Sequence, residues 1–272
     1  MSTYRDDSLI EQFNRAPAGT CQAMPRGVLE LVRAGDRLHQ ESQGYFDLTL
    51  KPLLDLWGFG PKGQGEAVPD AERLAEARQR VGQQHLRIEG EQLCKDADVQ
   101  VDFNSIAAGY AVDLIVARLG ELGVTSYLVE ATGELKAAGF KPDGSHWRIG
   151  LEAPRDDQRM AQRILQLDGY GISTSGDYRN YFEENGQRYS HTLDPLTGKP
   201  VNHKLAAVTV ADPSTLRADG LSTLLMVLGP DAGMAFAERN AIAAFFVTRE
   251  GEGFVTQGTT AFEQLFAAGD EQ

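Results

Sequence analysis

The sequence predicts a mixed α and β fold in which antiparallel hairpins are flanked by helices. Turn residues stand between short strand-like runs at Glu89-Gly90, Asn185-Gly186 and 250–253. Asn-Gly is the strongest of these signals, because both residues tolerate the positive φ of a tight hairpin turn. Two long segments, 105–123 and 212–229, carry apolar residues at helical spacing between a capping residue and a glycine.

The first hundred residues are expected to contain three helices and one hairpin. The helices cover 8–14, 28–41 and 69–80, and the hairpin covers 86–94. Cys21 and Cys94 are expected to be inert, since two cysteines give neither a disulfide framework nor a zinc spacing.

The rest of the chain alternates strands with two long helices. A strand ends near Asp102, Asn104 or Ser105 caps a helix, and that helix stops at Gly123. Its inward residues are expected to be Ile106, Tyr110, Leu114 and Ile115. Further strands are expected at 126–130, 135–138, 147–152, 163–167, 179–183, 188–194, 206–211 and 241–248, and further helices at 212–229 and 231–239.

Composition limits the classes of partner. The 272 residues suffice for one large domain or two closely joined lobes. The net charge of −13 makes nucleic acid an unlikely partner, so a polyanionic ligand needs a metal ion or backbone amides to offset its charge. No apolar run is long enough to span a bilayer, and residues 1–15 lack the apolar core of a signal peptide.

The segment 171–201 suggests an anion-binding loop beside a histidine. Its first residues, 171–176, are mostly glycine, serine and threonine, and their backbone N–H groups can approach an anion closely. The return strand that follows Asn185-Gly186 places Tyr189, His191 and Leu193 on one face. The alternative is an ordinary surface hairpin with a solvated histidine.

Two helices and one loop offer further polar groups. Small residues in the first turn after Ser105 let a ligand approach the positive helix end, or else let the helix pack closely on a sheet. Asp219, Ser222 and Thr223 share a helix face whose oxygens suit a hard cation such as Mg²⁺. The alternative is that Asp219 only hydrogen-bonds a neighbouring Thr within a buried helix, which would give the same pattern. Tyr45-Phe46-Asp47 offers aromatic rings and a carboxylate for a flat heterocycle, or simple packing.

Four motifs together resemble the ApbE-type FAD:protein FMN transferase family. They are GYFDLTLKPLLDLWGFGP (44–61), VDFNSIAAGYAVD (101–113), the whole 171–201 segment and LRADGLSTLLMVLG (216–229). The resemblance implies an α+β fold, with mixed and antiparallel sheets flanked by helices in one domain over 1–272. It also implies an enzyme that transfers FMN from FAD to a Thr or Ser hydroxyl of an acceptor protein through a phosphoester, releasing AMP. Two other activities stay open: a Mg²⁺-dependent FAD pyrophosphatase and a non-catalytic FAD-binding protein.

The resemblance also implies roles for particular residues. His191 stands at the family's SH-x-x-DP histidine and is expected to take the proton of the acceptor hydroxyl. We expect the Asp219 carboxylate to lie close to the start of the helix after Asp102. The implied Mg²⁺ ligands are Asp219, Thr223, Ser222 and, through its carbonyl, Ser105. The implied FAD contacts are Tyr4, Tyr45, Phe46, Asp47, Asp102, Leu193 and the residue at Ala108.

The chain departs from the family pattern in three places. Members often have lysine where Ala108 stands, so a cationic contact to FAD is expected to be missing. Thr132-Gly133-Glu134 replaces Gly-Gly-Glu, which is tolerated if Thr132 keeps negative φ. The family's N-terminal segment, with its export signal, lipid-attached cysteine and Met-Gly-Thr, is expected to be absent. Membership further implies a periplasmic, inner-membrane-anchored protein whose acceptors are flavoprotein subunits of membrane redox complexes.

Overall fold

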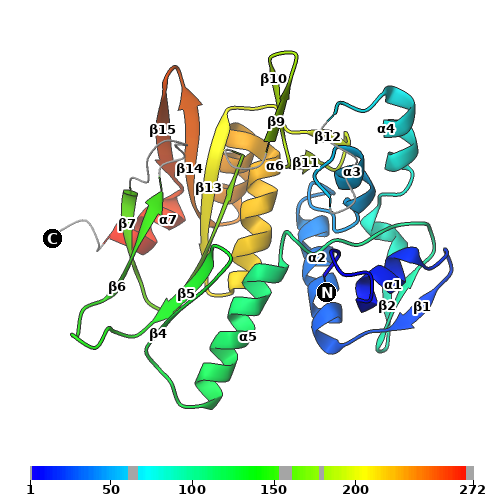
Figure 1. Cartoon of the computed structure of the whole chain (residues 1–272). Coiled ribbons are helices and arrows are strands. Elements are labelled where there is room, and N and C mark those ends of the chain that lie inside the picture. The colour runs from blue at the N-terminus through cyan, green and yellow to red at the C-terminus, as the bar shows by residue number, and fades with distance from the viewer. Residues whose placement is uncertain (1, 61–66, 153–160, 178–180, 268–272) are drawn as a thin grey trace. The chain divides into compact units, whose positions relative to one another are not determined.

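The computed structural model describes residues 2–60, 67–152, 161–177 and 181–267, and these form two compact units. Unit 1 comprises Met1–Ser105 and Tyr181–Asn202, and unit 2 comprises Ile106–Asn180 and His203–Gln272. The chain therefore passes three times between the units, and its course can be followed by colour in Figure 1.

Unit 2 is built on a six-stranded antiparallel sheet. The strand order is β15-β14-β13-β8-β5-β4, so β8 lies in the interior, between β13 and β5. A separate antiparallel hairpin is formed by β6 and β7. The strands are β4 (Tyr127–Ala131), β5 (Glu134–Ala138), β6 (Trp147–Glu152), β7 (Ala161–Leu167), β8 (Tyr170–Gly176), β13 (Leu205–Asp212), β14 (Ala243–Glu250) and β15 (Gly253–Gly258).

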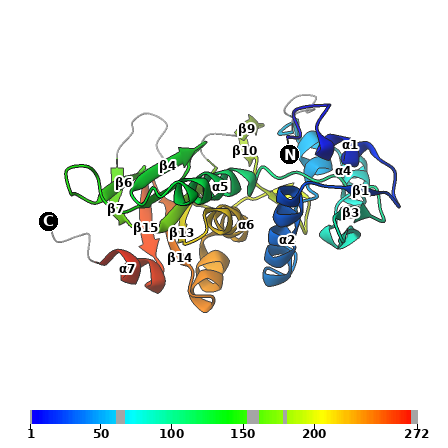
Figure 2. The same cartoon turned by 90° about the horizontal axis from the view of Figure 1, so that it is seen from below.

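The two faces of this sheet are covered differently. Helices α5 (Ala107–Glu121) and α6 (Thr215–Arg239) lie side by side on one face (Figures 1 and 2). The other face packs against β6, β7 and α7 (Thr260–Phe266) in an apolar cluster. Because side chains alternate along a strand, Ile172 of β8 joins that cluster while Ser173 points toward α6.

Helix α6 is the central helix of unit 2. Ser214 caps its first turn by accepting a hydrogen bond from the Arg217 amide. Gly229, with φ of 78°, breaks the helix before Pro230, so the predicted division into two helices is confirmed. By length and composition α6 could cross a membrane, but 61% of its apolar window is buried inside the protein, as is usual for a core helix.

The described residues of unit 1 form four helices and several short strands. A 3₁₀ turn, Gln83–His85, leads into β2 of a three-stranded antiparallel sheet, whose order is β1-β3-β2. The helices are α1 (Leu9–Arg15), α2 (Arg26–Glu41), α3 (Lys51–Leu56) and α4 (Ala71–Arg78). The strands are β1 (Cys21–Ala23), β2 (Leu86–Glu89), β3 (Gln92–Lys95), β9 (Tyr181–Glu184), β10 (Gln187–Ser190), β11 (Leu193–Asp194) and β12 (Lys199–Pro200).

The hairpin β9–β10 and helix α3 share an aromatic cluster. Tyr189 stacks on Trp57 and on Phe182, with ring centroids 5.7 and 5.0 Å away. Trp57 is buried, and its indole N–H donates to the carbonyl of Gly198 at 2.9 Å. Asn185 and Gly186 have φ of 52° and 75°, as the predicted turn requires.

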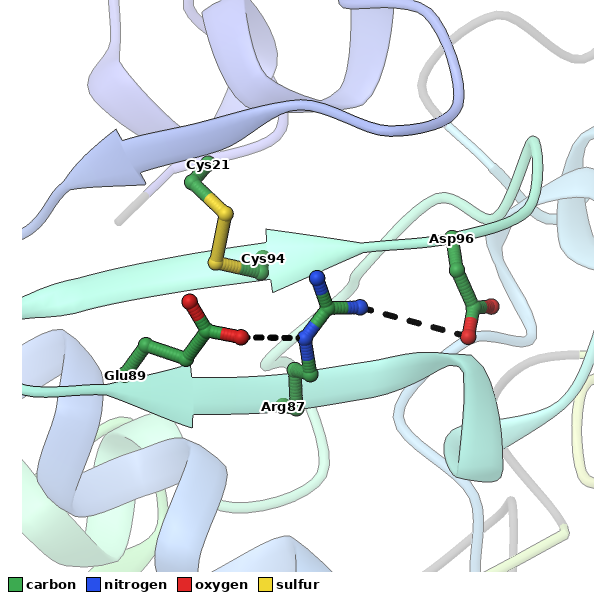
Figure 3. The surroundings of a disulfide bond; sticks show 5 residues. All are labelled: Cys21, Arg87, Glu89, Cys94 and Asp96. Atoms are coloured by element: carbon green, nitrogen blue, oxygen red, sulfur yellow. Dashed lines mark hydrogen bonds and ion pairs between the residues drawn. A yellow bond between two sulfur atoms is a disulfide. The ribbon is translucent and has the colours of Figure 1, made fainter.

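The prediction that both cysteines are inert is wrong. Cys21 and Cys94 face each other across β1 and β3 and form a disulfide (Figure 3). Their separation of 73 residues in the chain gave no local signal, because only strand pairing brings them together. Beside the disulfide, Arg87 of β2 forms an ion pair with Glu89 at 2.6 Å.

Several other predictions about local structure need correction. The sequence patterns missed α3 and α7, which are only six and seven residues long. Helix α5 has Ile106 at its N-cap, without a side-chain cap from Asn104 or Ser105. Leu114 and Ile115 are 49% and 44% exposed and so do not face inward.

Candidate functional site

Asp219 of α6 is fixed against the first turn of α5. Its Oδ2 accepts a hydrogen bond from the Gly109 amide at 2.9 Å, so the late helix meets the early helix as expected. That amide belongs to the first turn of α5, where N–H groups have no partner within the helix. A Cβ at position 109 would lie 2.3 Å from the Thr215 carbonyl oxygen, so the close approach requires glycine.

A second carboxylate anchors the helix pair in the reverse direction. Asp113 of α5 accepts hydrogen bonds from the Thr215 and Leu216 amides at the start of α6, at 2.9 and 3.0 Å. It also accepts from the Ser214 hydroxyl at 2.9 Å. Each helix thus supplies the carboxylate that caps the other. The two capping contacts together fix the position of Asp219.

Hydroxyl groups surround the helix turn that carries Asp219. The Ser222 hydroxyl donates to the Asp219 carbonyl at 2.9 Å and lies 3.1 Å from Ser173 Oγ and 2.9 Å from Ser175 Oγ. Ser173 and Ser175 reach α6 together because they alternate along β8. Residues 171–176, the predicted anion-binding segment, form part of strand β8, which pairs with β13 and presents hydroxyls to α6.

The Asp219 carboxyl group lies in an unfavourable electrostatic environment. It is 5% exposed, and burial first, then the charge of Glu134, raises its pKa to about 8. Hydrogen bonds from the Gly109 amide and the Ser173 side chain oppose this rise without cancelling it. A hard divalent cation would stabilise the ionised carboxylate. The surrounding carboxylate and hydroxyl oxygens are donors that such a cation prefers.

The turn before Glu134 differs from the expectation. Thr132 has φ of 57° and Gly133 has φ of 111°, so the condition that Thr132 keep negative φ is not met. The β4–β5 register leaves only these two residues in the turn, and a two-residue turn of this kind requires positive φ at both. The Thr132 hydroxyl donates to Glu134 Oε2 at 3.2 Å.

In unit 1, Asp102 is the most buried of the predicted polar contacts to FAD. Its carboxylate accepts from the Thr3 hydroxyl at 3.0 Å and from the Asn104 amide at 2.7 Å. Burial raises its pKa, while these two hydrogen bonds and the charge of Lys51 lower it. Asp102 therefore ties residue 3 to the segment before α5.

Asp47 holds the segment after α2 in place. Its Oδ1 accepts from the Thr49 amide at 2.7 Å and its Oδ2 from the Gln83 amide at 3.0 Å. Asp47 also lines a cavity of about 470 Å³, together with His39 and Arg78. The contact of Asp47 with FAD stays a prediction.

The remaining predicted residues differ in exposure. Tyr4 is 67% exposed, whereas Phe46 and Leu193 are buried. Tyr45, His191 and Ala108 are half-buried, and Ala108 lies in the first turn of α5. His191 follows β10 rather than continuing it, so the single strand expected over 188–194 is interrupted.

The metal ligands suggested by the sequence lie in two parts of the chain. Asp219, Ser222 and Thr223 belong to unit 2, and Ser105 is the last residue of the first segment of unit 1. The structure brings Asp219 and Ser222 into one hydrogen-bonded group, while Thr223 is half-buried on the next position of α6. Sequence reasoning missed Glu134, Ser173 and Ser175 as neighbours of Asp219, although assigning 171–176 as a strand would have grouped the two serines.

The fold and this site define a class of protein: an α+β protein with a buried carboxylate–hydroxyl centre suited to a hard divalent cation. Residues 1–246 match the model of the ApbE family. A Vibrio cholerae FAD:protein FMN transferase is 43% identical over 98% of this chain and 80% of its own length. The chain belongs to the ApbE family.

Solved structures agree with this assignment. The apo form of the Pseudomonas stutzeri flavinyl transferase ApbE matches 99% of this chain and 84% of its own, with 66% identity and a TM-score of 0.93. The Thermotoga maritima ApbE protein matches 95% of this chain and 84% of its own, with 29% identity and a TM-score of 0.83.

Proposed function

We propose that this chain is a transferase that moves FMN from FAD to the hydroxyl of a threonine or serine in an acceptor protein. The hydroxyl oxygen bonds to the FMN phosphorus as the bond from that phosphorus to the bridging oxygen breaks. AMP leaves with the bridging oxygen, and the hydroxyl releases its proton. Relatives named FAD:protein FMN transferase support the activity. The structural observation that carries the proposal is the buried Asp219 carboxylate fixed at the start of α5.

The proposed metal is Mg²⁺, with Asp219, Ser222 and Thr223 as ligands from α6 and the Ser105 carbonyl as a further ligand. When bound, Mg²⁺ would offset the negative charge that develops on the leaving phosphate. The chain's own contribution is to hold the ligands in place. The Gly109 amide fixes one Asp219 oxygen, and the Ser173 and Ser175 hydroxyls fix the Ser222 side chain.

FAD is proposed to contact unit 1 through Tyr4, Tyr45, Phe46, Asp102 and Leu193. Asp47 is proposed to act by ordering its segment as well as by contact. His191 is proposed as the base that takes the proton from the acceptor hydroxyl. Histidine is the side chain that ordinarily gains and loses its proton near neutral pH, which suits that task.

The acceptor is proposed to be a flavoprotein subunit of a membrane redox complex, and the compartment to be the periplasm, with the natural protein anchored at the inner membrane. The disulfide between Cys21 and Cys94 supports an oxidising compartment, because disulfides are rare in the reducing cytosol. The net charge of −13 gives no support to a nucleic-acid partner.

One assay tests the activity. The protein is incubated with FAD, Mg²⁺ and a candidate acceptor domain, and flavin fluorescence on the acceptor is read on a denaturing gel beside free FMN and AMP. We expect labelled acceptor with the natural sequence, none with Asp219→Ala, and full labelling with Glu252→Ala in the exposed β14–β15 turn as a control. Free FMN and AMP without labelled acceptor would identify a pyrophosphatase, and intact FAD would identify a binding protein.

A further inference from the structure

Thr3 is a buried residue whose hydroxyl group bonds one of the proposed FAD contacts. It is 3% exposed, and its Oγ1 donates a hydrogen bond to Asp102 Oδ2 at 3.0 Å. Asp102 is 7% exposed, so water competes little for this bond. The two residues stand 99 positions apart in the sequence, and both belong to unit 1. The bond therefore joins the segment around residue 3 to the segment before α5.

The other donors that the structure describes at the Asp102 carboxylate are local. The Asn104 backbone amide donates to Oδ1 at 2.7 Å, and the Asn104 side-chain amide donates to Oδ2 at 3.2 Å. Bonds to a residue two positions ahead order the turn itself, but they leave the carboxylate free to move together with that turn. The Thr3 hydroxyl comes from a distant segment, so it holds the carboxylate against a second part of unit 1.

The backbone of Asp102 is attached to another stretch of proposed FAD contacts. Its amide donates to the Leu48 carbonyl at 2.8 Å, one residue beyond the stretch 45–47. The proposed contacts in that stretch are Tyr45, Phe46 and Asp47. Thr3 thus bonds the residue at which these two stretches of unit 1 meet.

Tyr4, which follows Thr3 directly, is 67% exposed. Its amide donates to Ser2 Oγ at 3.2 Å, and the Ser8 hydroxyl donates to the Ser2 carbonyl at 2.7 Å. Residues 2–8 therefore form a turn that closes on itself, and the Thr3 hydroxyl attaches this turn to Asp102. Folding buries little of the Tyr4 side chain, whereas a flat ligand gains affinity from an aromatic ring whose backbone is already ordered.

We propose that Thr3 is a positioning residue for FAD binding. Its hydroxyl holds the Asp102 carboxylate and keeps the Tyr4 backbone beside it, so that both proposed contacts are in place before FAD arrives. Ordering these groups in advance lowers the entropy cost of binding. The inference rests on the proposed function, because it takes Asp102 and Tyr4 to contact FAD. Thr3 acts on the affinity for FAD and takes no part in the bond-breaking step.

The test measures FAD binding and transfer by the full chain. Titration of flavin fluorescence without Mg²⁺ or acceptor gives the Kd of intact FAD, steady-state FMN transfer gives KM and kcat, and thermal unfolding without FAD gives the stability. Thr3→Val removes the hydroxyl at nearly constant size, and Thr3→Ser keeps it.

Thr259 provides the matched control in unit 2. It is also fully buried, and its hydroxyl donates to the Ile242 carbonyl at 2.7 Å and accepts from the Ala244 amide at 3.0 Å. Thr259→Val therefore removes a buried hydroxyl group from a part of the chain that is outside the proposed FAD contacts.

We expect Thr3→Val to raise both the Kd and the KM for FAD about tenfold, as the loss of one hydrogen bond of ordinary strength would, and to leave kcat within about twofold. Thr3→Ser should bind FAD within about threefold of the natural protein, because it keeps the donor. Thr259→Val should lower the unfolding temperature without changing the Kd. In an Asp102→Ala background, Thr3→Val should weaken FAD binding much less than in the natural sequence, because its partner is already gone.

Three results would overturn the inference alone. The first is an unchanged Kd in Thr3→Val while Asp102→Ala has lost affinity. The second is an equal effect of Thr3→Val with and without the Asp102 carboxylate. The third is a Thr3→Val protein that fails to fold or loses kcat as well as affinity, which would make Thr3 a structural residue. If Asp102→Ala itself leaves the Kd unchanged, the FAD contact assigned to Asp102 under the proposed function fails, and this inference fails with it.

Discussion

Substitution of Gly109 tests the contact on which the site depends. In Gly109→Ala the new Cβ would lie 2.3 Å from the Thr215 carbonyl oxygen and 2.8 Å from Asp219 Cβ. Both neighbours belong to the packed turn of α6, so α5 must move away from α6. That movement lengthens or breaks the hydrogen bond from the residue-109 amide to Asp219.

The size of the effect follows from three opposing contributions. Overpacking costs about 1–3 kcal/mol, and loss of a hydrogen bond to the protonated Asp219 carboxyl group costs about 0.5–1.5 kcal/mol. Replacing glycine by alanine in a helix returns about 1 kcal/mol. We expect a net loss of about 2 kcal/mol, or a fall of roughly 7 °C in the unfolding temperature of unit 2.

Gly120 provides the matched control in the same helix. A Cβ at position 120 meets no atom within 4 Å, so Gly120→Ala keeps only the gain in helix propensity. Thermal and denaturant unfolding of the two variants should therefore give changes of opposite sign, and only Gly109→Ala should weaken Mg²⁺ binding. Equal stability of the two variants would refute the argument that close contact between α5 and α6 positions Asp219.

Three further predictions concern the metal centre, the disulfide and the β4–β5 turn. Mg²⁺ requires the ionised Asp219, whose pKa is about 8 without metal, so the Kd from calorimetry should fall about tenfold between pH 6 and pH 7 and level off above pH 8. Because the native state keeps a proton there that the unfolded chain loses, the metal-free stability from denaturant unfolding should fall as pH rises from about 4 to 8, and Asp219→Asn should remove that slope. The double variant Cys21→Ala, Cys94→Ala opens a loop of 73 residues, which should destabilise unit 1 by about 4 kcal/mol in denaturant unfolding. Reduction of the natural protein should give the same loss. Unchanged stability would contradict a stabilising role of the disulfide. Thr132→Asn should raise stability by about 1 kcal/mol in thermal unfolding, since Asn tolerates the left-handed φ of 57° better than a β-branched residue. A loss of stability would show that the Thr132–Glu134 hydrogen bond contributes more than the relief of backbone strain.

The sequence predicted the features that short-range rules control. Asn185-Gly186 turns a hairpin, Gly123 ends α5 with φ of 76°, and Gly229 divides α6, each because the backbone needs a conformation that few residues adopt. Ser8 caps α1 by accepting from the Glu11 amide for an equally local reason. The amphipathic spacing of α2 likewise identified its buried face.

Other features depended on partners distant in the chain. Asp113 and Asp219 cap each other's helices across about a hundred residues of sequence, so the expected local cap at Asn104 or Ser105 was not needed. Leu114 has an apolar side chain at helical spacing, yet the packing of α5 on α6 and the sheet leaves it exposed.

The sequence by itself determined several turns, the long helices and the family, and it singled out Asp219 as the acidic residue of the proposed metal site. Only the tertiary structure decided which groups surround that acid. Strand pairing placed 171–176 in the interior strand β8, whose alternation brings Ser173 and Ser175 to Ser222 on α6. Strand pairing likewise joined Cys21 to Cys94. In both cases the physical reason is the same: sheet register is set by contacts among distant segments, and no local pattern carries it.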